Sequence, residues 1–206
     1  MEIKKSAETQ NHKETLRIEA FSDGVFCVAV TLLAIEIGVE VKDNMTDAQL
    51  SQSLLKLWPY YLAYFLSFVN VLLAWIGHHD LFKNLKSSDN FLMISNGMLL
   101  MLVALLPFPT KTLGLYLNTD AIKTAVVFYT GYFVLISLAF RFLWYAASHK
   151  QNLLINDLTQ QHIKQITKNE NIGLITNIII TAVAFINPWI ALVMSFSMWI
   201  YWIVLS

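Results

Sequence analysis

The sequence predicts an all-α, polytopic membrane protein that crosses the bilayer six times. Of its 206 residues, 56% are hydrophobic and only 14% are charged, and the hydrophobic residues gather in long runs separated by polar segments. A run of about 20 apolar residues can cross the bilayer core as a helix. A helix is expected because it satisfies its own backbone hydrogen bonds within lipid. We therefore expect one membrane domain over residues 1–206.

The first expected span covers residues 17–38 and carries a carboxylate near each end, at Asp23 and Glu36. The uncharged stretch between them, from Gly24 to Ile35, is roughly 18 Å of helix at 1.5 Å per residue. A bilayer core is about 30 Å thick, so both carboxylates lie inside the hydrocarbon limits or close to them. Because such a carboxylate faces protein or water rather than lipid, we expect this helix to face the interior of the assembly.

An apolar stripe runs along one side of that helix. At 100° per residue, Val28, Thr31, Leu32 and Ile35 fall on one narrow face, whereas Asp23 projects from the other side. A single hydroxyl among aliphatic side chains is compatible with the lining of a narrow pore. It is equally compatible with a packing seam against a neighbouring helix, and helical geometry leaves both interpretations open.

The next three expected spans cover residues 57–77, 91–108 and 124–147. The second span begins with Trp58 and Pro59, which is typical of an aromatic belt and of a proline in a first helical turn. We expect the third span to end at Pro107 and Pro109, because neither suits a helix interior, and residues 110–123 to form a linker. The fourth run is long enough to cross the bilayer with some tilt.

The last apolar segment is too long for one span, at about 50 Å as a single helix. Asn187-Pro188 interrupts it, which predicts two short spans over residues 172–186 and 189–205, joined by a tight hairpin. The total is then six spans, with five as the alternative count. Among the polar segments, we expect residues 1–14 to be a loose lead-in and residues 148–170 to form an amphipathic helix that lies at the surface or against the bundle.

The distribution of basic residues predicts the orientation. Six spans place both termini on one side of the membrane, and that side carries ten lysines and arginines against four on the other. The positive-inside rule then places both termini in the cytoplasm. We expect a multi-pass protein of the plasma membrane, or of the inner membrane in a cell that has two.

Composition argues against several classes of function. The formal net charge is zero, so no basic surface predicts nucleic-acid binding. Cys27 is the only cysteine, which excludes an intrachain disulfide. His78 and His79 are adjacent rather than at the i, i+4 spacing of a helical metal site, so no metal is expected. No Ser-His-Asp or phosphate-loop pattern occurs, and we therefore expect neither an enzyme nor a cofactor.

A motif in the first span resembles a known family. The stretch from Arg17 to Leu33 reads RIEAFSDGVFCVAVTLL, and its Arg17-x-x-x-Phe21-Ser22-Asp23 string resembles the signature of the transmembrane-protein-175 family. These are potassium channels known from lysosomes, with single-repeat relatives in bacteria and archaea. The Trp75-x-x-His78 ending of the second span and the chain length are also similar.

The resemblance implies a homotetramer in which the first helix of each subunit lines a pore at the symmetry axis, without a re-entrant filter loop. The family's pore constriction maps to Val28, Leu32 and Ile35, and a hydroxyl layer implicated in ion selection maps to Thr31. These are the residues of the apolar stripe. Val28 is smaller than the side chains usual at the first constriction, which implies a wider neck and modest selectivity.

The motif residues off the stripe are expected to form a structural or gating network. Asp23 requires hydrogen-bond donors from other helices, and the candidates are Trp75, His78 and Asn96. Arg17 either faces an inner vestibule or folds back to this network. Glu36 either attracts cations at the outer mouth or only reaches towards water. The full set is Arg17, Phe21, Ser22, Asp23, Trp75, His78 and Asn96.

The expected function is a potassium-permeable cation channel whose partners are its own copies and membrane lipids, with K⁺ as the permeant ion. The alternatives are a secondary transporter, a proton-conducting protein and a membrane scaffold. Transporters tend to show paired repeats and helices broken near the midplane. The two halves of this chain do not resemble each other, so a channel is favoured.

Overall fold

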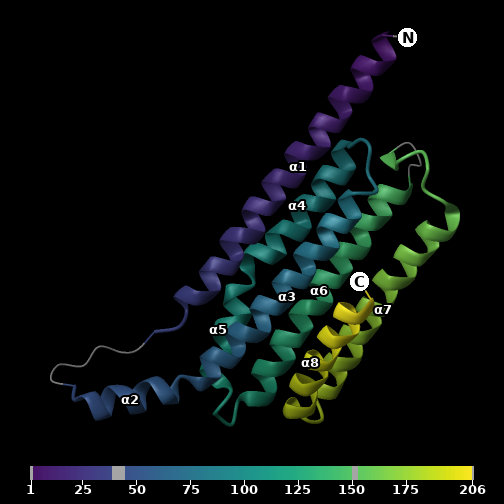
Figure 1. The fold of residues 1–206 in the computed structure, drawn as a ribbon. Helices are drawn as coiled ribbons and strands as arrows, with labels where there is room; N and C mark the ends of the chain where they lie inside the picture. Colours follow the sequence, from purple (N-terminus) through teal and green to yellow (C-terminus); the bar gives the residue numbers. More distant parts are fainter. Residues whose placement is uncertain (1, 39–44, 150–152, 206) are drawn as a thin grey trace.

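The computed structural model describes residues 2–38, 45–149 and 153–205, and these fold almost entirely into helices (Figure 1). Within them no strand forms, and the one isolated β-bridge joins Leu85 to Leu154. The helices are α1 (Glu2–Ile35), α2 (Asp47–Lys56), α3 (Trp58–Phe82), α4 (Asn90–Leu105), α5 (Pro107–Tyr116), α6 (Ile122–His149), α7 (Gln160–Ala184) and α8 (Pro188–Leu205).

Four stretches of helix are long and apolar enough to cross a membrane: Glu14–Ile35, Trp58–Phe82, Asn90–Tyr116 and Ile122–His149. They correspond to the first four expected spans. A shorter apolar helix covers Pro188–Trp199. The all-α membrane class is confirmed, whereas the count of six spans stays a prediction that depends on α7 and α8.

The third crossing is longer than the sequence predicts. Its helix passes from α4 into α5 with only Leu106 between them, and α5 continues to Tyr116. Pro107 occupies a first position of α5, where a missing N–H costs nothing because that group has no partner within the helix. The expected linker from residue 110 was therefore wrong, and its first residues belong to α5.

Two predictions about polar segments were also wrong. The lead-in before residue 15 is not a loose coil, since α1 begins at Glu2. The helix expected over 148–170 forms only in its second part, because α6 ends at His149 and α7 begins at Gln160, with a connection between them. In this connection the backbone of Leu153 accepts a hydrogen bond from Lys86 N at 2.9 Å, which ties it to the turn between α3 and α4.

The break at Asn187-Pro188 is confirmed. Helix α7 ends at Ala184 and α8 begins at Pro188. Asn187 Oδ1 accepts hydrogen bonds from the backbone N–H of Trp189 (3.0 Å) and Ile190 (3.2 Å). The asparagine thereby caps the first turn of α8, whose N–H groups have no partner inside the helix.

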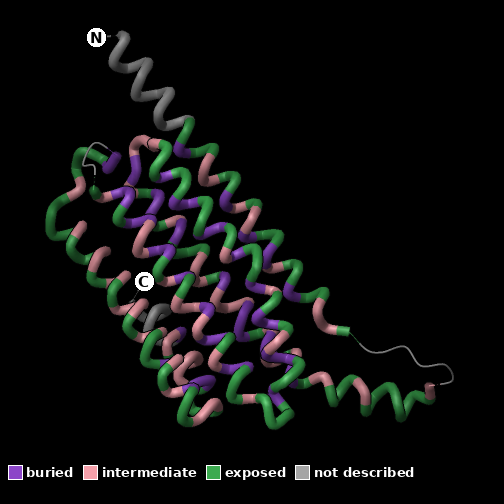
Figure 2. Tube along the Cα trace, turned by 180° about the vertical axis from the view of Figure 1, so that it is seen from behind, coloured by how far each residue is buried: buried purple, intermediate pink, exposed green. Residues whose placement is uncertain are grey.

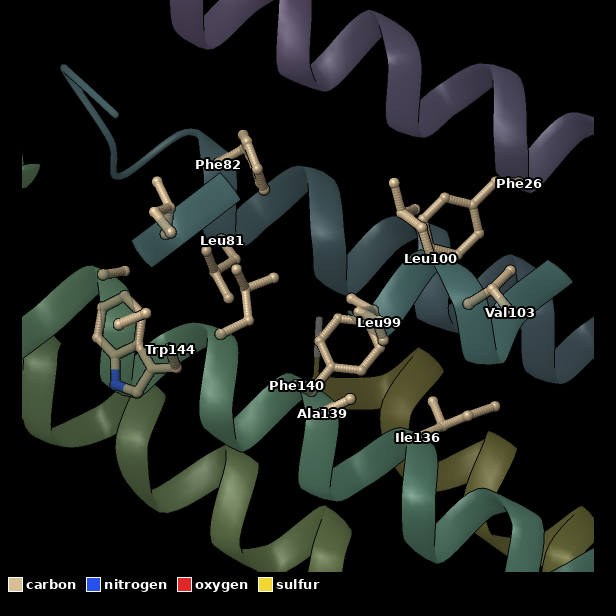
Figure 3. Close-up of a cluster of buried hydrophobic side chains, with 14 of the residues drawn as sticks. Phe26, Leu81, Phe82, Leu99, Leu100, Val103, Ile136, Ala139, Phe140 and Trp144 are labelled. Atoms are coloured by element: carbon tan, nitrogen blue, oxygen red, sulfur yellow. The ribbon is translucent and has the colours of Figure 1, made fainter. Parts of the chain in front are cut away.

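Helix α1 lies across α3 and α4, and α4 packs in turn on α6, while α7 and α8 lie on the opposite flank (Figure 1). Buried residues follow the inner faces of the bundle, and the outer faces are exposed (Figure 2). Figure 3 shows the core where α1, α3, α4 and α6 meet, with Phe26, Leu99 and Phe140 directed into it. This core fixes which side of α1 faces inward.

Candidate functional site

The two faces of α1 differ sharply in burial. Ser22, Phe26, Ala29 and Leu33 are each no more than 2% exposed and pack towards α3 and α4. They recur at intervals of three or four residues, as the inner face of a helix requires. One side of α1 is therefore fixed to its own subunit, and the other side is free of it.

The apolar stripe lies on the free side. Val28 is 55% exposed, Leu32 39% and Ile35 74%, and Thr31 between them is exposed as well. Thr31 Oγ1 donates a hydrogen bond to the carbonyl of Val28 at 2.8 Å, so its hydrogen is used within the helix and its oxygen lone pairs face outward. The stripe is thus an aliphatic surface with the one hydroxyl of Thr31, and its own subunit leaves it exposed.

A chain of hydrogen bonds joins the motif serine to α3 and α4. Asn96 Nδ2 donates to Ser22 Oγ at 2.9 Å, and Ser22 Oγ donates to the carbonyl of Ile18 at 2.8 Å. The other side of the Asn96 amide, Oδ1, lies 2.9 Å from His78 Nε2. All three side chains are buried, at 0% exposed for Ser22 and His78 and 2% for Asn96. Because a buried polar group is costly to leave unpaired, this chain specifies the register of α1 against α3 and α4.

The geometry also assigns the tautomer of His78. The Asn96 oxygen accepts only, so His78 must carry its proton on Nε2. Nδ1 of the same ring is buried and has no partner among the described residues. The ring stacks on Phe82 with centroids 4.3 Å apart and contacts Phe26 at 5.4 Å, which leaves Nδ1 as a lone acceptor among apolar groups.

The motif aspartate is held by a different group. Trp75 Nε1 donates to Asp23 Oδ1 at 2.7 Å. Of the three donors that the sequence suggested, only Trp75 bonds Asp23 in the structure. Asn96 donates to Ser22 instead, and His78 bonds Asn96. A second contact lies one turn earlier on α1, where His79 Nδ1 is 2.7 Å from Glu19 Oε1. The rings of Trp75 and His79 stack with centroids 6.0 Å apart, so the two side chains that contact Asp23 and Glu19 lie against each other on α3.

Sequence reasoning missed the contact between Glu19 and His79. The available signal was position, because Glu19 precedes Asp23 by four residues and must therefore lie on the same side of α1. His79 was considered only as part of a metal site. Among the described residues no cluster of three or more potential metal ligands occurs.

The remaining candidates lie at the edges of the site. Arg17 is exposed on α1, and Phe21 is 67% exposed beside it. Glu36, just beyond the end of α1, forms an ion pair with Lys111 of α5 at 2.7 Å. The sequence missed this pair because it assigned Lys111 to a linker. Helix α1 is thus attached along its middle, at residues 19–23, by the network and just beyond its C-terminal end by an ion pair.

Comparison with known proteins gives the family. A family model described as the endosomal/lysosomal potassium channel TMEM175 matches residues 17–107. A protein of Chamaesiphon minutus named as a potassium channel is 38% identical over 194 residues, which cover 94% of this chain and 96% of that protein. The chain belongs to the TMEM175 family.

Structural comparison agrees with membership of the TMEM175 family. The crystal structure described as a lysosomal potassium-selective channel TMEM175 homologue from Chamaesiphon minutus superposes with a TM-score of 0.82 at 37% identity, covering 93% of this chain and 97% of that one. The match to TMEM175 of Bos taurus, which is named as a proton channel, is 32% identical over 57% of this chain and 27% of that protein. These TMEM175 relatives are named as channels, so the family indicates ion conduction rather than catalysis.

Proposed function

We propose that this protein is a potassium-permeable cation channel, in which the stripe of Val28, Thr31, Leu32 and Ile35 lines a pore at the axis of a homotetramer. The observation that carries the proposal is the division of α1 into two faces. The inner face is held by buried packing and hydrogen bonds, whereas the stripe is an uncovered aliphatic surface. Membership of a family of named potassium channels supports the same function.

Several copies of α1 are needed to enclose a pore. Rotational symmetry repeats each stripe residue as a ring, so four subunits would produce stacked rings of valine, leucine and isoleucine. Each ring presents only aliphatic carbon to the axis. Water leaves such a constriction readily, which blocks ions without any side chain plugging the path.

Conduction then requires the aliphatic neck to widen. The outward oxygens of Thr31 offer a ring of acceptors between two apolar rings, and they can replace a few of the waters around a passing cation. A potassium ion loses hydration water at lower cost than a sodium ion, so this exchange favours potassium modestly. The small Val28 side chain at the first ring favours a wide neck, in keeping with modest selectivity.

The hydrogen-bonded motif residues hold and orient the pore helix. Ser22 and Asp23 are attached to α3 and α4 through Asn96 and Trp75, on the face of α1 opposite the stripe. A rotation or shift of α1 during gating must break or exchange these bonds. We assign the network to positioning and gating of α1. We also propose that the protein lies in the plasma or inner membrane with both termini on the cytoplasmic side.

A proton-conducting function is the second candidate. Its support is the contact between His79 and Glu19, two titratable groups 2.7 Å apart on a partly exposed surface beside Asp23. Several animal relatives, including that of Danio rerio, are named as proton channels. A secondary transporter has no comparable observation in its favour.

Reversal potentials of the purified, reconstituted protein test the proposal. With potassium on one side and sodium on the other, a potassium-preferring channel shifts the zero-current voltage towards the potassium equilibrium potential, and discrete single-channel steps appear. A shift that follows only an imposed pH gradient would establish proton conduction instead. Flux that requires a coupled second solute and shows no steps would establish a transporter and refute the channel.

A further inference from the structure

A cavity of about 710 Å³ opens into the subunit on the flank away from the pore stripe. Its walls come from α3, α6 and α7, with one end closed by Met198 and Trp199 of α8. No residue of α1 lines it. The cavity is therefore separate from the site described above.

Helices α6, α7 and α8 are held together beside this space. Helix α7 is fixed to α6 by hydrogen bonds from Trp144 Nε1 to Thr167 and from Asn177 Nδ2 to Ser137, each 2.8 Å long. Helix α8 packs against α7, α6 and α3 (Figure 1) and contributes Met198 and Trp199 to the lining of the cavity.

The lining of the cavity changes character along α3. Its inner part is mainly apolar, with Val71, Ala74, Ile136 and Phe140 among the side chains that form it. The polar side chains of Asn70, Ser137 and Asn177 also contribute to the lining. Towards the end of α3 the lining becomes polar and includes Asp80, Asn84, Lys168 and Glu170. An apolar interior with a polar rim is the pattern of a site for an amphiphilic molecule.

The polar rim carries charges of both signs. Lys168 is exposed on α7 and takes part in no ion pair with a described residue. Glu170 lies two positions further along, and no described residue donates a hydrogen bond to its carboxylate. Arg141, a cation that acts on Glu170, directs its Nε hydrogen to Asn171 at 2.8 Å. Asp80 is paired with Lys83 at 2.8 Å. A ligand at this rim therefore meets the unpaired ammonium group of Lys168 and the carboxyl group of Glu170. Burial raises the pKa of Glu170 to about 7 and Arg141 opposes that rise, so a cationic group brought beside this carboxyl favours its ionised form.

We propose that the cavity binds one phospholipid with a zwitterionic, ammonium-bearing headgroup. The acyl chain occupies the apolar interior, the phosphate lies at Lys168, and the ammonium group lies at Glu170. A headgroup with negative charge alone would set that charge beside Glu170 and Asp80 as well as Lys168, so charge complementarity favours the zwitterion. The volume lies within the range of roughly 300–1,000 Å³ that is usual for ligand pockets. In the proposed orientation the rim is on the cytoplasmic side, which makes the ligand a lipid of the inner leaflet.

Native mass spectrometry of the delipidated protein tests this directly, by titration with phosphatidylethanolamine and, separately, with phosphatidylglycerol. We expect one phosphatidylethanolamine per subunit, bound in preference to phosphatidylglycerol. Lys168→Gln and Glu170→Gln should each weaken that binding about tenfold, because each removes one charge-assisted hydrogen bond. The matched control is Lys164→Gln, which changes an exposed lysine on the same helix outside the cavity and should have no effect.

A filling variant locates the lipid. Ala74→Trp places a large ring in the apolar interior and should abolish binding, whereas Leu138→Trp adds the same ring at a side chain of α6 that is 47% exposed and should leave binding intact. If Ala74→Trp fails to fold, Ile136→Phe serves the same purpose. Equal binding of both lipids, unaffected by the charge and filling variants, would identify surface lipid and overturn the proposal. Binding of detergent only, or of nothing, would overturn it as well. No current is measured, so failure of this test is distinct from failure of the channel proposal.

Discussion

Replacing Leu32 by alanine distinguishes a pore neck from an ordinary packing seam. The side chain is 39% exposed in the subunit, and its neighbour Leu33 is 1% exposed on the inner face of the same helix. Leu33→Ala is therefore a matched control, since it makes the same chemical change one residue away on the buried face of α1. Leu32→Ala shortens a side chain on the exposed stripe, whereas Leu33→Ala shortens one in the core.

The structure gives the expected cost of each change. Fully burying a leucine is worth about 1.5–3 kcal/mol, so the part of Leu32 that its own subunit covers accounts for roughly 1–2 kcal/mol. Leu33→Ala leaves a cavity in a packed core and should cost about 2–5 kcal/mol. On the proposed arrangement, Leu32→Ala also removes one ring from the neck in every subunit. A neck barrier lowered by about 1.4 kcal/mol raises the current about tenfold.

Single-channel and macroscopic currents in reconstituted bilayers, together with thermal unfolding, measure both effects. We expect Leu32→Ala to raise the current about tenfold with a small fall in Tm, and Leu33→Ala to lower Tm strongly with no gain in current per folded channel. The reasoning would be refuted if Leu32→Ala lost stability as Leu33→Ala does and its folded fraction conducted no better than the parent. The stripe would then be a seam.

Three further variants test the attachments of α1. Asn96→Leu removes the donor to Ser22 Oγ and the acceptor for His78 Nε2, and it should cost about 1–3 kcal/mol, measured by chemical or thermal unfolding. Asp23→Asn should impair assembly or open probability, as seen by size-exclusion chromatography and by currents, and normal currents from a well-expressed variant would reject the gating role. Glu36→Gln breaks a partly exposed ion pair with Lys111, so it should lower Tm only slightly, and a fall in Tm that did not shrink at high salt would contradict this.

Directions around a single helix could be predicted from the sequence. The 100° rotation per residue separates the stripe from Asp23, and the structure places these residues on exposed and partly covered sides of α1. The break at Asn187 was predictable for a similar reason, because proline acts on its own neighbours. Such features depend on bond geometry within a few residues.

Pairing between helices was not predictable in the same way. Trp75 and Asp23 are 52 positions apart, and Asn96 and Ser22 are 74 apart, so their contact depends on the relative register of three helices. The sequence contains three possible donors for Asp23 and no means to rank them. Packing determines which of them bonds Asp23, because His78 contacts Phe26 and Phe82 and its Nε2 is directed at Asn96 instead.

Proline can either end a helix or occupy its first turn, and the sequence alone does not distinguish these two effects at Pro107. Proline ends a helix when it removes a hydrogen bond, and it is harmless in a first turn, where no bond is lost. Pro107 follows Leu106, the one residue between α4 and α5, and the chain continues as helix from Pro107 onwards. The choice depends on whether tertiary packing supports a second helix, and here Leu113 and Gly114 of α5 are buried against the bundle.

The position of the hydrogen-bonded network bears on how α1 can move. Ser22 is buried and joined through Asn96 to His78, so three helices share one chain of hydrogen bonds. The stripe begins only six positions further along the same rigid helix, and any rotation about the helix axis turns both faces by the same angle. A rotation large enough to carry Leu32 off a central axis would therefore strip Ser22 of its partner in the core, at a cost of about 1–3 kcal/mol per subunit. In the proposed tetramer this cost arises in each subunit that rotates, so rotation is unfavourable unless the network has a second set of partners. His78 Nδ1, a buried acceptor with no described partner, is the group in this network able to accept a hydrogen bond in such a rearranged state.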